Sequence, residues 1–268
     1  MKTDNLDVAL IIPAHNEEDA LPVVLDNLPR GINRIVVVNN GSTDRTSEIA
    51  SQHRVLVVDE PVMGYGKACL AGLAALRENS PDIVAFVDAD GSDDLSHLSD
   101  LIFPVAASEV DLVLGCRIPT VADALTIQQR FGHFLATGLI SLFWKHRFRD
   151  LGPMRVIRWT SLEQLAMADE DFGWTVEMQV RALKHGLRIR EIDVPYNRRI
   201  AGASKISRTV IGTIKAGSTI LWIICRELMD SARQISKGAI HGTSSLTETQ
   251  TQNQNKKGEK GLADVNTV

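Results

Sequence analysis

The chain has no apolar run that approaches the roughly 20 residues needed to span a bilayer. The nearest segments are Gly132–Trp144 and Thr219–Cys225. The first is bracketed by Arg130 and by Lys145–Arg147, so it suits either a core helix or a helix that lies in a membrane interface. We therefore expect no transmembrane segment.

Cysteine is scarce and charge is nearly balanced. Cys69, Cys116 and Cys225 are scattered through apolar surroundings, which favours reduced thiols in a cytosolic compartment over disulfides or a zinc site. The formal net charge of −4 gives no basic footprint, so we expect no nucleic-acid partner. The segment Met1–Asp7 lacks the apolar core of a signal peptide.

Apolar segments and helical patterns alternate through the first part of the chain. Strands are expected at Val8–Ile12, Arg34–Val38, Val55–Val58, Ile83–Val87 and Asp111–Gly115. A first helix is expected at Glu17–Asn27, with Asn16 as its N-cap, and a second is expected to end at Ala50, with Ser42 or Thr43 as its cap. A third helix is expected to end at Arg77, and a fourth is expected near Asp94–Ala107. This alternation predicts an α/β fold with a mainly parallel, doubly wound sheet and helices on both faces.

The alternation ends after Arg117. Helices are expected at 128–145 and 176–185, a strand at 188–194, and an amphipathic helix at 207–228 that lies on a membrane or packs on the domain. From residue 242 the chain is rich in Ser, Thr, Gln, Asn and Lys without periodicity, so residues 242–268 are expected to be disordered.

The strand Val84–Val87 runs directly into Asp88 and Asp90. Parallel strands present their functional groups at their carboxyl ends, where α/β sheets bind substrates. Two carboxylates there supply hard oxygen ligands for Mg²⁺ or Mn²⁺, and that ion can clamp a diphosphate. A solvated acidic turn is the alternative interpretation of this short pattern.

Three further polar loops follow parallel strands and are expected at the same sheet edge. They are Pro13–Glu17, Asn39–Asp44 and Gly64–Lys67. Their amides and carboxylates suit contacts to a base or a ribose, although Asn40 to Ser42 also suits an ordinary tight turn. Gly64–Lys67 lacks the spacing of a P-loop, so it is expected at the rim of a nucleotide site.

Taken together, these loops resemble, in order and spacing, the GT-A domain of family 2 glycosyltransferases. The later part is similar to the dolichyl- or polyprenyl-phosphate sugar synthase branch of that family. The resemblance covers roughly Leu6 to Glu227, and its later carriers are Gly115–Arg117, Asp150–Arg155, Glu177 and Arg199–Lys205.

The resemblance implies roles for individual residues. It places Asp90 on the metal with Asp88 beside it, and Asp88 and Ala89 along the ribose and sugar-phosphate. Arg117 and Arg199 would bind phosphate of the donor or of a lipid acceptor, as would Lys205. The remaining residues of the implied nucleotide-sugar site are Pro13, His15, Glu17, Val38, Asn40 and Lys67.

Two positions depart from the family pattern. Asn39 and Asn40 stand where an acidic pair is common, so an amide replaces the carboxylate that contacts the base and the choice between uridine and guanosine stays open. Ser92 stands where the branch often has glutamine, so Ser92, Asp93 or water would complete the metal coordination.

The resemblance implies a metal-dependent, inverting transfer of a hexose from UDP- or GDP-hexose to polyprenyl phosphate. That acceptor is already ionised, so cations rather than a strong base are required, and Arg117 would serve catalysis in this way. A soluble hydroxyl acceptor, such as a sugar acid or a glycan, is the alternative; it would require a base, for which Asp150 and Glu177 are candidates.

Two other classes remain as alternatives. A sugar-phosphate nucleotidyltransferase is disfavoured because no G-x-G-T-R-type loop follows the first strand. A non-catalytic nucleotide-sugar binder is disfavoured because the metal aspartate is present. We expect one GT-A domain over residues 1–228, with a nucleotide-binding half at 1–117 and an acceptor-binding half at 118–206. A cytoplasmic protein with peripheral contact to the inner membrane face is expected.

Overall fold

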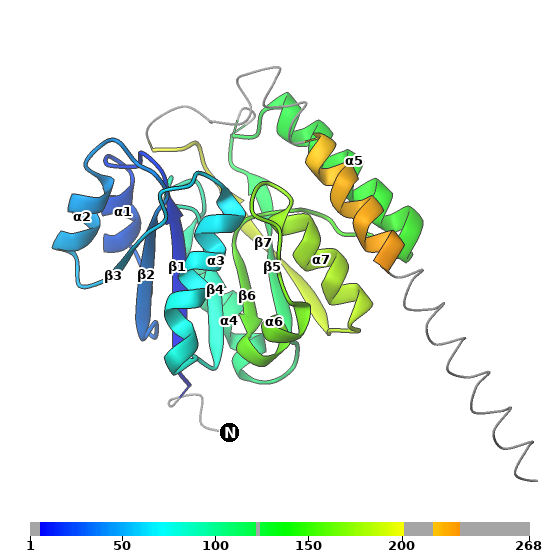
Figure 1. The fold of residues 1–268 in the computed structure, drawn as a ribbon, viewed down its shortest axis with the longest axis horizontal. Helices are drawn as coiled ribbons and strands as arrows, with labels where there is room; N and C mark the ends of the chain where they lie inside the picture. Colours follow the sequence, from blue (N-terminus) through cyan, green and yellow to red (C-terminus); the bar gives the residue numbers. More distant parts are fainter. Residues whose placement is uncertain (1–5, 122–123, 201–216, 231–268) are drawn as a thin grey trace, which may run out of the picture. The chain divides into compact units, whose positions relative to one another are not determined.

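In the computed structural model, the described residues are 6–121, 124–200 and 217–230. Contacts divide the chain into two units, Met1–Ile224 and Cys225–Val268. The first unit contains the sheet and the helices labelled in Figure 1, and residues 217–224 at its end are helical. In the second unit, residues 225–230 are helical.

The strands of the first unit form one sheet in the order β3-β2-β1-β4-β6-β5-β7. Every neighbouring pair is parallel except those of β6, which is antiparallel to both β4 and β5. The predicted mainly parallel sheet is therefore confirmed. The strands are β1 (Val8–Ala14), β2 (Arg34–Asn39), β3 (Leu56–Asp59), β4 (Ile83–Phe86), β5 (Leu112–Pro119), β6 (Arg155–Arg158) and β7 (Ile189–Tyr196).

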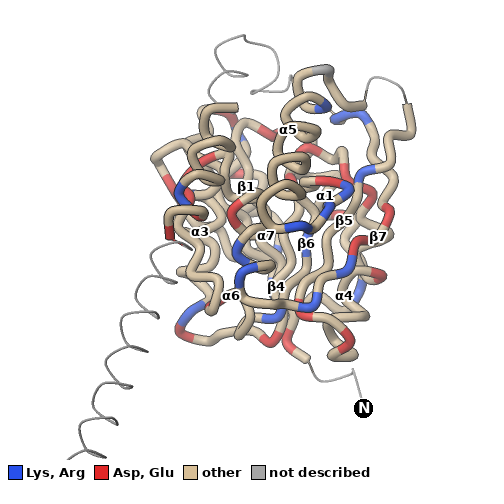
Figure 2. The backbone as a smooth tube through the Cα atoms, turned by 90° about the vertical axis from the view of Figure 1, so that its right-hand side faces the viewer, with Lys and Arg blue, Asp and Glu red and all other residues tan. Residues whose placement is uncertain are grey.

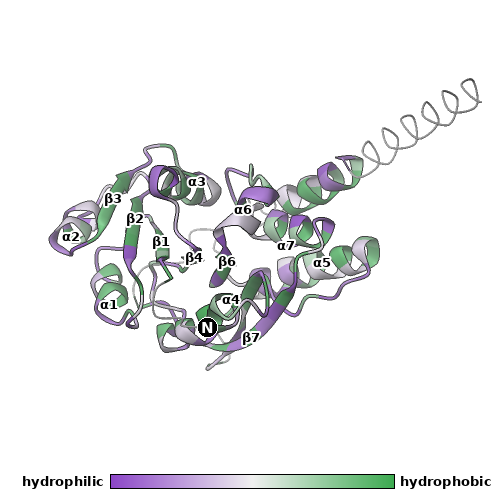
Figure 3. Cartoon of the chain, turned by 90° about the horizontal axis from the view of Figure 1, so that it is seen from below, coloured by the Kyte–Doolittle hydropathy of each residue, from purple (hydrophilic) through white to green (hydrophobic). Residues whose placement is uncertain are grey.

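Helices cover both faces of this sheet. In Figures 1 and 3, α3, α6 and α7 lie on one face, and α1 and α4 lie on the other. Two 3₁₀ turns, Arg77–Asn79 and Leu95–His97, complete the unit. The helices are α1 (Leu21–Asp26), α2 (Thr46–Gln52), α3 (Tyr65–Leu76), α4 (Leu98–Ala106), α5 (Ile127–Trp144), α6 (Trp159–Leu165) and α7 (Trp174–Lys184).

The core lies along the central strands, because their side chains are apolar on both faces. All four residues of β4 are buried, as are the first five of β1. Close packing of α3 depends on Gly72, where a Cβ would lie 2.7 Å from Ile11 Cγ2 and 3.2 Å from Val38 Cγ2. Strand β7 is at the sheet edge and is more polar, as its purple colour in Figure 3 shows.

Strand β6 and helix α6 were not predicted. Strand β6 has arginine at both ends and only Val156 and Ile157 between them, so it is too short and too charged to display a strand pattern. By contrast, α5 lies where a helix was expected. It begins with a capping box in which Thr126 and Gln129 satisfy each other's backbone N–H groups.

The predicted caps of the first two helices are wrong. Helix α1 begins at Leu21 rather than at Glu17, and Asn16 lies before it in the left-handed region with φ of 52°. The Asn16 side chain instead accepts a hydrogen bond from the backbone N–H of Thr43 at 2.7 Å, and Ser42 Oγ accepts one from Asn16 N at 3.0 Å. These polar residues therefore tie two loops together.

The later part of the predicted amphipathic helix is helical in residues 217–224, whereas residues 207–216 lie outside the described residues. The tail at 242–268 also lies outside them. Among the described helices, none combines the length and the apolar character that crossing a bilayer requires.

Candidate active site

Three carboxylates gather where β4 ends. Asp90 and Asp93 are buried, with 3% and 6% of their surface exposed. Oδ1 of Asp88 and both carboxylate oxygens of Asp93 are buried without a hydrogen-bond partner. Unpartnered buried oxygens are costly, so this cluster is held ready to receive positive charge.

The electrostatics of the cluster reflect this crowding. Burial, and then the neighbouring Asp90 carboxylate, raise the pKa of Asp88 to about 7. Burial also raises the pKa of Asp93 well above its ordinary value, with Asp88 and Asp90 adding to the effect. Arg199 and Arg117 both act to lower the pKa of Asp88, so both guanidinium groups lie within electrostatic reach of the cluster.

Arg199 makes the most direct contact with the cluster. Its Nε lies 2.6 Å from Oδ2 of Asp90, and its Nη2 lies 3.5 Å from Oε1 of Glu17. The other Asp90 oxygen, Oδ1, accepts a hydrogen bond from Ser92 N at 2.8 Å and another from Ser92 Oγ. Arg199 thus contacts both Asp90 and Glu17, and all three were predicted as site residues.

The loop after β1 and the loop after β2 meet as predicted. His15 Nδ1 is 2.8 Å from the carbonyl oxygen of Asn40. The Asn40 amide donates to the carbonyls of Glu60 and Val62 and accepts from Gly64 N. The Asn40 side chain therefore supports the loop at residues 60–64, and its contact with a base stays a prediction.

Pro13 and Val38 lie opposite each other in the β1–β2 register. The Val38 side chain is fully buried in the core, so its predicted contact with the base stays a prediction. Ala89 is also buried, with 3% of its surface exposed.

Lys67 lies in the first turn of α3. Its Nζ is 3.3 Å from Glu170 Oε2, and its backbone N–H donates to the Glu170 carbonyl at 2.9 Å. A Cβ on Gly66 would lie only 2.1 Å from the carbonyl oxygen of Asp169. The start of α3 therefore packs closely against the loop that carries Glu170.

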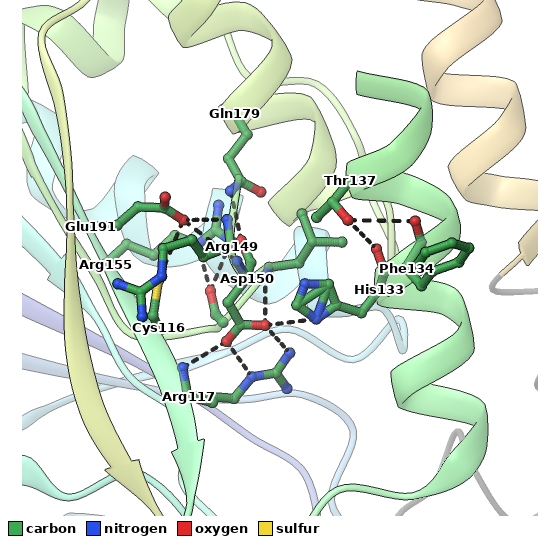
Figure 4. Close-up of polar contacts among 12 residues, drawn as sticks. Cys116, Arg117, His133, Phe134, Thr137, Arg149, Asp150, Arg155, Gln179 and Glu191 are labelled. Carbon is green, nitrogen blue, oxygen red and sulfur yellow. Dashed lines mark hydrogen bonds and ion pairs between the residues drawn. The ribbon is translucent and has the colours of Figure 1, made fainter. Parts of the chain in front are cut away.

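Arg117 is held by Asp150 and lies near His133 (Figure 4). The Asp150 carboxylate accepts hydrogen bonds from Arg117 Nε, Nη2 and backbone N, each at 2.8 Å, and His133 Nδ1 lies 3.1 Å from Asp150 Oδ1. Burial acts to lower the pKa of Arg117, but the ion pair with Asp150 raises it above its ordinary value. The guanidinium carbon lies 5.3 Å from the Tyr196 ring centroid, so the cation is fixed in place.

This arrangement assigns the two candidate bases other roles. Asp150 is the anchor of Arg117. Glu177 is fully buried, accepts hydrogen bonds from the backbone N–H groups of Ala168 and Asp169, and pairs with Arg181 at 3.0 Å. Both carboxylates are thus paired with arginines, and the predicted catalytic role of Glu177 stays a prediction. Lys205 lies outside the described residues.

The donor set suits a divalent cation that also binds phosphate. No group of three or more His, Cys, Asp or Glu side chains within the described ranges is arranged as a complete metal site. Mg²⁺ is commonly held by one or two carboxylates together with substrate phosphates and water. Asp88, whose buried Oδ1 has no hydrogen-bond partner, and the buried Asp90 fit that type of site.

Two residues of the site, Tyr196 and His133, were not predicted. Tyr196 follows a predicted strand, and an aromatic residue at a strand end was the available signal. His133 lies in an apolar helix and gave no signal. Figure 2 shows that acidic and basic positions interleave near β5 and β7, where ion pairs join Arg188 with Asp111 and Arg190 with Glu109.

A mainly parallel sheet with an aspartate pair after its central strand is the architecture of the GT-A glycosyltransferases. The model of the family described as Glycosyl transferase family 2 matches residues 9–165. The chain belongs to that family and is a glycosyltransferase.

Relatives and solved structures agree with this assignment. An uncharacterized glycosyltransferase of Mycobacterium tuberculosis is 38% identical over 215 residues, covering 78% of this chain and 94% of that protein. A dolichyl-phosphate hexose transferase of Haloferax volcanii is 29% identical, covering 82% and 95%. Glucosyl-3-phosphoglycerate synthase from M. tuberculosis, solved with Mn²⁺, UDP and glucosyl-3-phosphoglycerate, has a TM-score of 0.62 at 19% identity, covering 82% and 80%.

Proposed function

We propose that this enzyme transfers a hexose, with inversion, from a nucleoside diphosphate hexose to polyprenyl phosphate, using Mg²⁺ or Mn²⁺. The observation that carries the proposal is the placement of two arginines at the carboxylates: Arg199 Nε lies 2.6 Å from Asp90 Oδ2, and Arg117 lies 5.3 Å from the ring of Tyr196, which forms the bridge with Asp93. Two cations beside a carboxylate pair suit a reaction in which two phosphate-bearing substrates meet. The similarity to a dolichyl-phosphate hexose transferase supports the lipid acceptor.

The proposed step needs little proton transfer. An oxygen of the acceptor phosphate attacks the anomeric carbon, and the bond to the nucleoside diphosphate breaks with its electron pair moving to the leaving β-phosphate oxygen. A phosphate monoester is largely ionised at neutral pH, because its second pKa is about 6. Arg117 and Arg199 bring the two anions together, and a divalent cation at Asp90 and Asp88 would supply Lewis acidity for the leaving diphosphate.

A lipid acceptor requires contact with a membrane, and α5 presents a suitable face. Phe131, Phe134 and Leu142 are 62%, 75% and 69% exposed and follow one another at helical spacing. Arg130 precedes this stripe and Lys145 follows it, so an apolar face is flanked by cations. We propose that α5 lies in the interface of an anionic membrane.

Product formation tests the proposal. The full-length enzyme would be incubated with Mn²⁺, a panel of UDP-, GDP- and dTDP-hexoses, and either polyprenyl phosphate in anionic vesicles or soluble acceptors such as 3-phosphoglycerate and simple sugars. Mass spectrometry should find a glycosyl lipid phosphate with one donor. Product only with a soluble acceptor would reassign the acceptor, and binding without any product would indicate a nucleotide-sugar binder.

A further inference from the structure

Residues 195–200, which we call the strap, lie antiparallel along the loop that carries Asp90. Backbone N–H groups of Asn197 and Ile200 donate to the carbonyls of Ser92 and Asp90 at 2.8 and 3.0 Å. Asp93 and Tyr196 form an antiparallel bridge in the same stretch. The strap is therefore fixed directly over the aspartate that the proposed function assigns to the metal.

Gly91 allows the strap to approach this closely. Its φ of +71° lies in the left-handed region, and a Cβ there would lie 2.2 Å from Ile200 Cδ1. The positive φ favours glycine at this turn, and a larger residue would also displace the Ile200 side chain. The position of Ile200 over Gly91 in turn fixes Arg199 beside Asp90.

Both oxygens of Asp90 are occupied in this arrangement. Ser92 holds Oδ1 through its backbone N–H and its hydroxyl, and Arg199 holds Oδ2. A divalent cation binds carboxylate oxygen at about 2.0–2.1 Å for Mg²⁺. A guanidinium group 2.6 Å from the same oxygen would repel that cation and block its approach.

We propose that Arg199 is the resident counter-ion of Asp90 and moves to the donor diphosphate when the nucleotide sugar binds, so that cation binding at Asp90 depends on the nucleotide. This inference rests on the proposed function, because it assumes a nucleoside diphosphate donor. The diphosphate offers Arg199 a new bidentate partner and at the same time supplies the cation with oxygen ligands. Two carboxylates alone leave the cation under-coordinated, and the diphosphate supplies the missing oxygen ligands. The movement of Arg199 to the diphosphate and the binding of the cation at Asp90 therefore favour each other.

The exchange predicts a measurable coupling between two ligands. Mn²⁺ would be titrated into the full-length protein, with calorimetry or the spectrum of free Mn²⁺ as readout, alone and with each of UDP, GDP and dTDP. In the wild type, one of these nucleotides should tighten Mn²⁺ binding by about 10-fold or more, within the usual range of 5- to 150-fold for coupled sites. In Arg199→Met, Mn²⁺ alone should bind about 10-fold more tightly than it binds to the wild type. The further increase in Mn²⁺ affinity that the nucleotide produces should be smaller than in the wild type.

Two variants serve as controls. Arg198→Met makes the same substitution at an exposed neighbour and should leave Mn²⁺ binding as in the wild type. The double variant Arg199→Met, Asp90→Asn should lose the tight Mn²⁺ binding of Arg199→Met. That loss would show that the increased Mn²⁺ affinity of Arg199→Met depends on Asp90. Because Arg199→Met leaves a buried carboxylate unpaired, it should also melt at a lower temperature, and Mn²⁺ alone should restore part of that loss.

The outcomes separate this inference from the proposed function. If Arg199→Met binds Mn²⁺ no more tightly than the wild type while the wild type forms glycosyl product, the exchange is wrong and the function stands. If the wild type binds Mn²⁺ in the presence of none of UDP, GDP and dTDP, both are wrong. A misfolded Arg199→Met would be replaced by Arg199→Gln, to which the same two outcomes apply.

Discussion

The Asp150 carboxylate organises more of the site than any other single group in the described chain. It receives three hydrogen bonds from Arg117 and one from the backbone N–H of Leu151. Burial alone would raise the pKa of Asp150, but the bonds from Arg117 outweigh burial and lower it below 3.8. Ionised Asp150 is therefore a stabilising group at neutral pH.

Asp150→Asn should lower the free energy of unfolding by about 3–5 kcal/mol at pH 7, because a buried arginine loses its charged partner. A carboxyl whose pKa is lowered by folding stabilises above its unfolded pKa and loses that effect as pH falls through the folded pKa. The difference from the wild type should thus be constant above about pH 5 and shrink below pH 4. Urea unfolding at pH 7, 5 and 3.5 measures it.

Asp111→Asn is the matched control for this measurement. Asp111 makes a similar pair with Arg188, but Arg188 is 56% exposed. Exposed ion pairs contribute about 0–1 kcal/mol, so the control should fall in that range. Equal losses at Asp150 and Asp111 would contradict the importance given to burial.

Asp90→Asn should reduce product formation by about 10²–10³-fold, the typical cost of removing one group that stabilises developing charge. The circular dichroism spectrum should be unchanged, because the loop at Asp90 is also held by backbone hydrogen bonds from the strap. Retained turnover that is insensitive to chelators would remove Asp90 from the proposed site. The measurement is initial rate at several Mn²⁺ concentrations.

At the scale of elements, the start of α3 packs closely against the loop at Asp169, because Gly66 leaves less room for a Cβ than any other glycine of the described residues. Gly66→Ala would place a Cβ 2.1 Å from the Asp169 carbonyl. Because that atom belongs to the backbone, the loop must shift, and we expect a loss of about 2–3 kcal/mol in unfolding free energy. Thermal and urea unfolding check this.

Gly138→Ala in α5 is the control, since a Cβ there meets nothing within 4 Å. Alanine is favoured over glycine in a helix by about 1 kcal/mol, so this variant should be as stable as the wild type or more so. A loss at Gly138 as large as that at Gly66 would mean that the close contact with the Asp169 carbonyl does not decide the effect.

The exposed stripe of α5 gives a second prediction for an element. Phe134→Ser should weaken binding to anionic vesicles, measured by sedimentation, by about 10-fold or more, because burying a Phe side chain contributes about 1.5–3 kcal/mol. Phe103→Ser changes a comparably exposed residue on α4, 59% against 75%, and should leave vesicle binding intact. Equal effects of the two substitutions would mean that α5 is not the membrane face.

The sequence was informative for elements whose residues are uniformly apolar. Strands β1 and β4 are buried on both faces and were predicted near their observed bounds. Strand β6 could not be predicted, because its stability comes from two neighbours rather than from its own residues. Asn16 was mistaken for a cap because the same side chain that caps a helix can bind a distant loop.

The candidate site was predictable to the same extent. Parallel strands had to bring the first loop and Asp90 to one sheet edge, and Glu17 and Asp90 do share Arg199. The ion pair of Arg117 with Asp150 was not predictable, because the two residues are 33 positions apart. They meet because β5, which carries Arg117, pairs with β6, which Asp150 precedes. Distant charge pairs leave no local pattern.

At the scale of the whole molecule, the stability of the fold can identify the base of the donor nucleotide, because the nucleotide that binds should stabilise the folded protein. A ligand that binds only the folded state stabilises it by about 2.7 kcal/mol at 100 times its Kd. For a protein of this size that corresponds to a rise of roughly 5–10 °C in the melting temperature. With Mn²⁺ present, we expect one of UDP, GDP and dTDP to give this rise, and equal shifts with all three would contradict a base-specific site.

The strand order also determines when each part of the sheet can assemble. Strands β2 to β4 each find a partner among strands already made, whereas β5 lies between β6 and β7, both of which follow it in the chain. As the polypeptide leaves the ribosome, β5 must therefore wait for at least some 40 further residues, about 2–8 s at ordinary rates of synthesis. During that interval its apolar residues have no strand beside them, which makes nascent β5 the natural target for a chaperone.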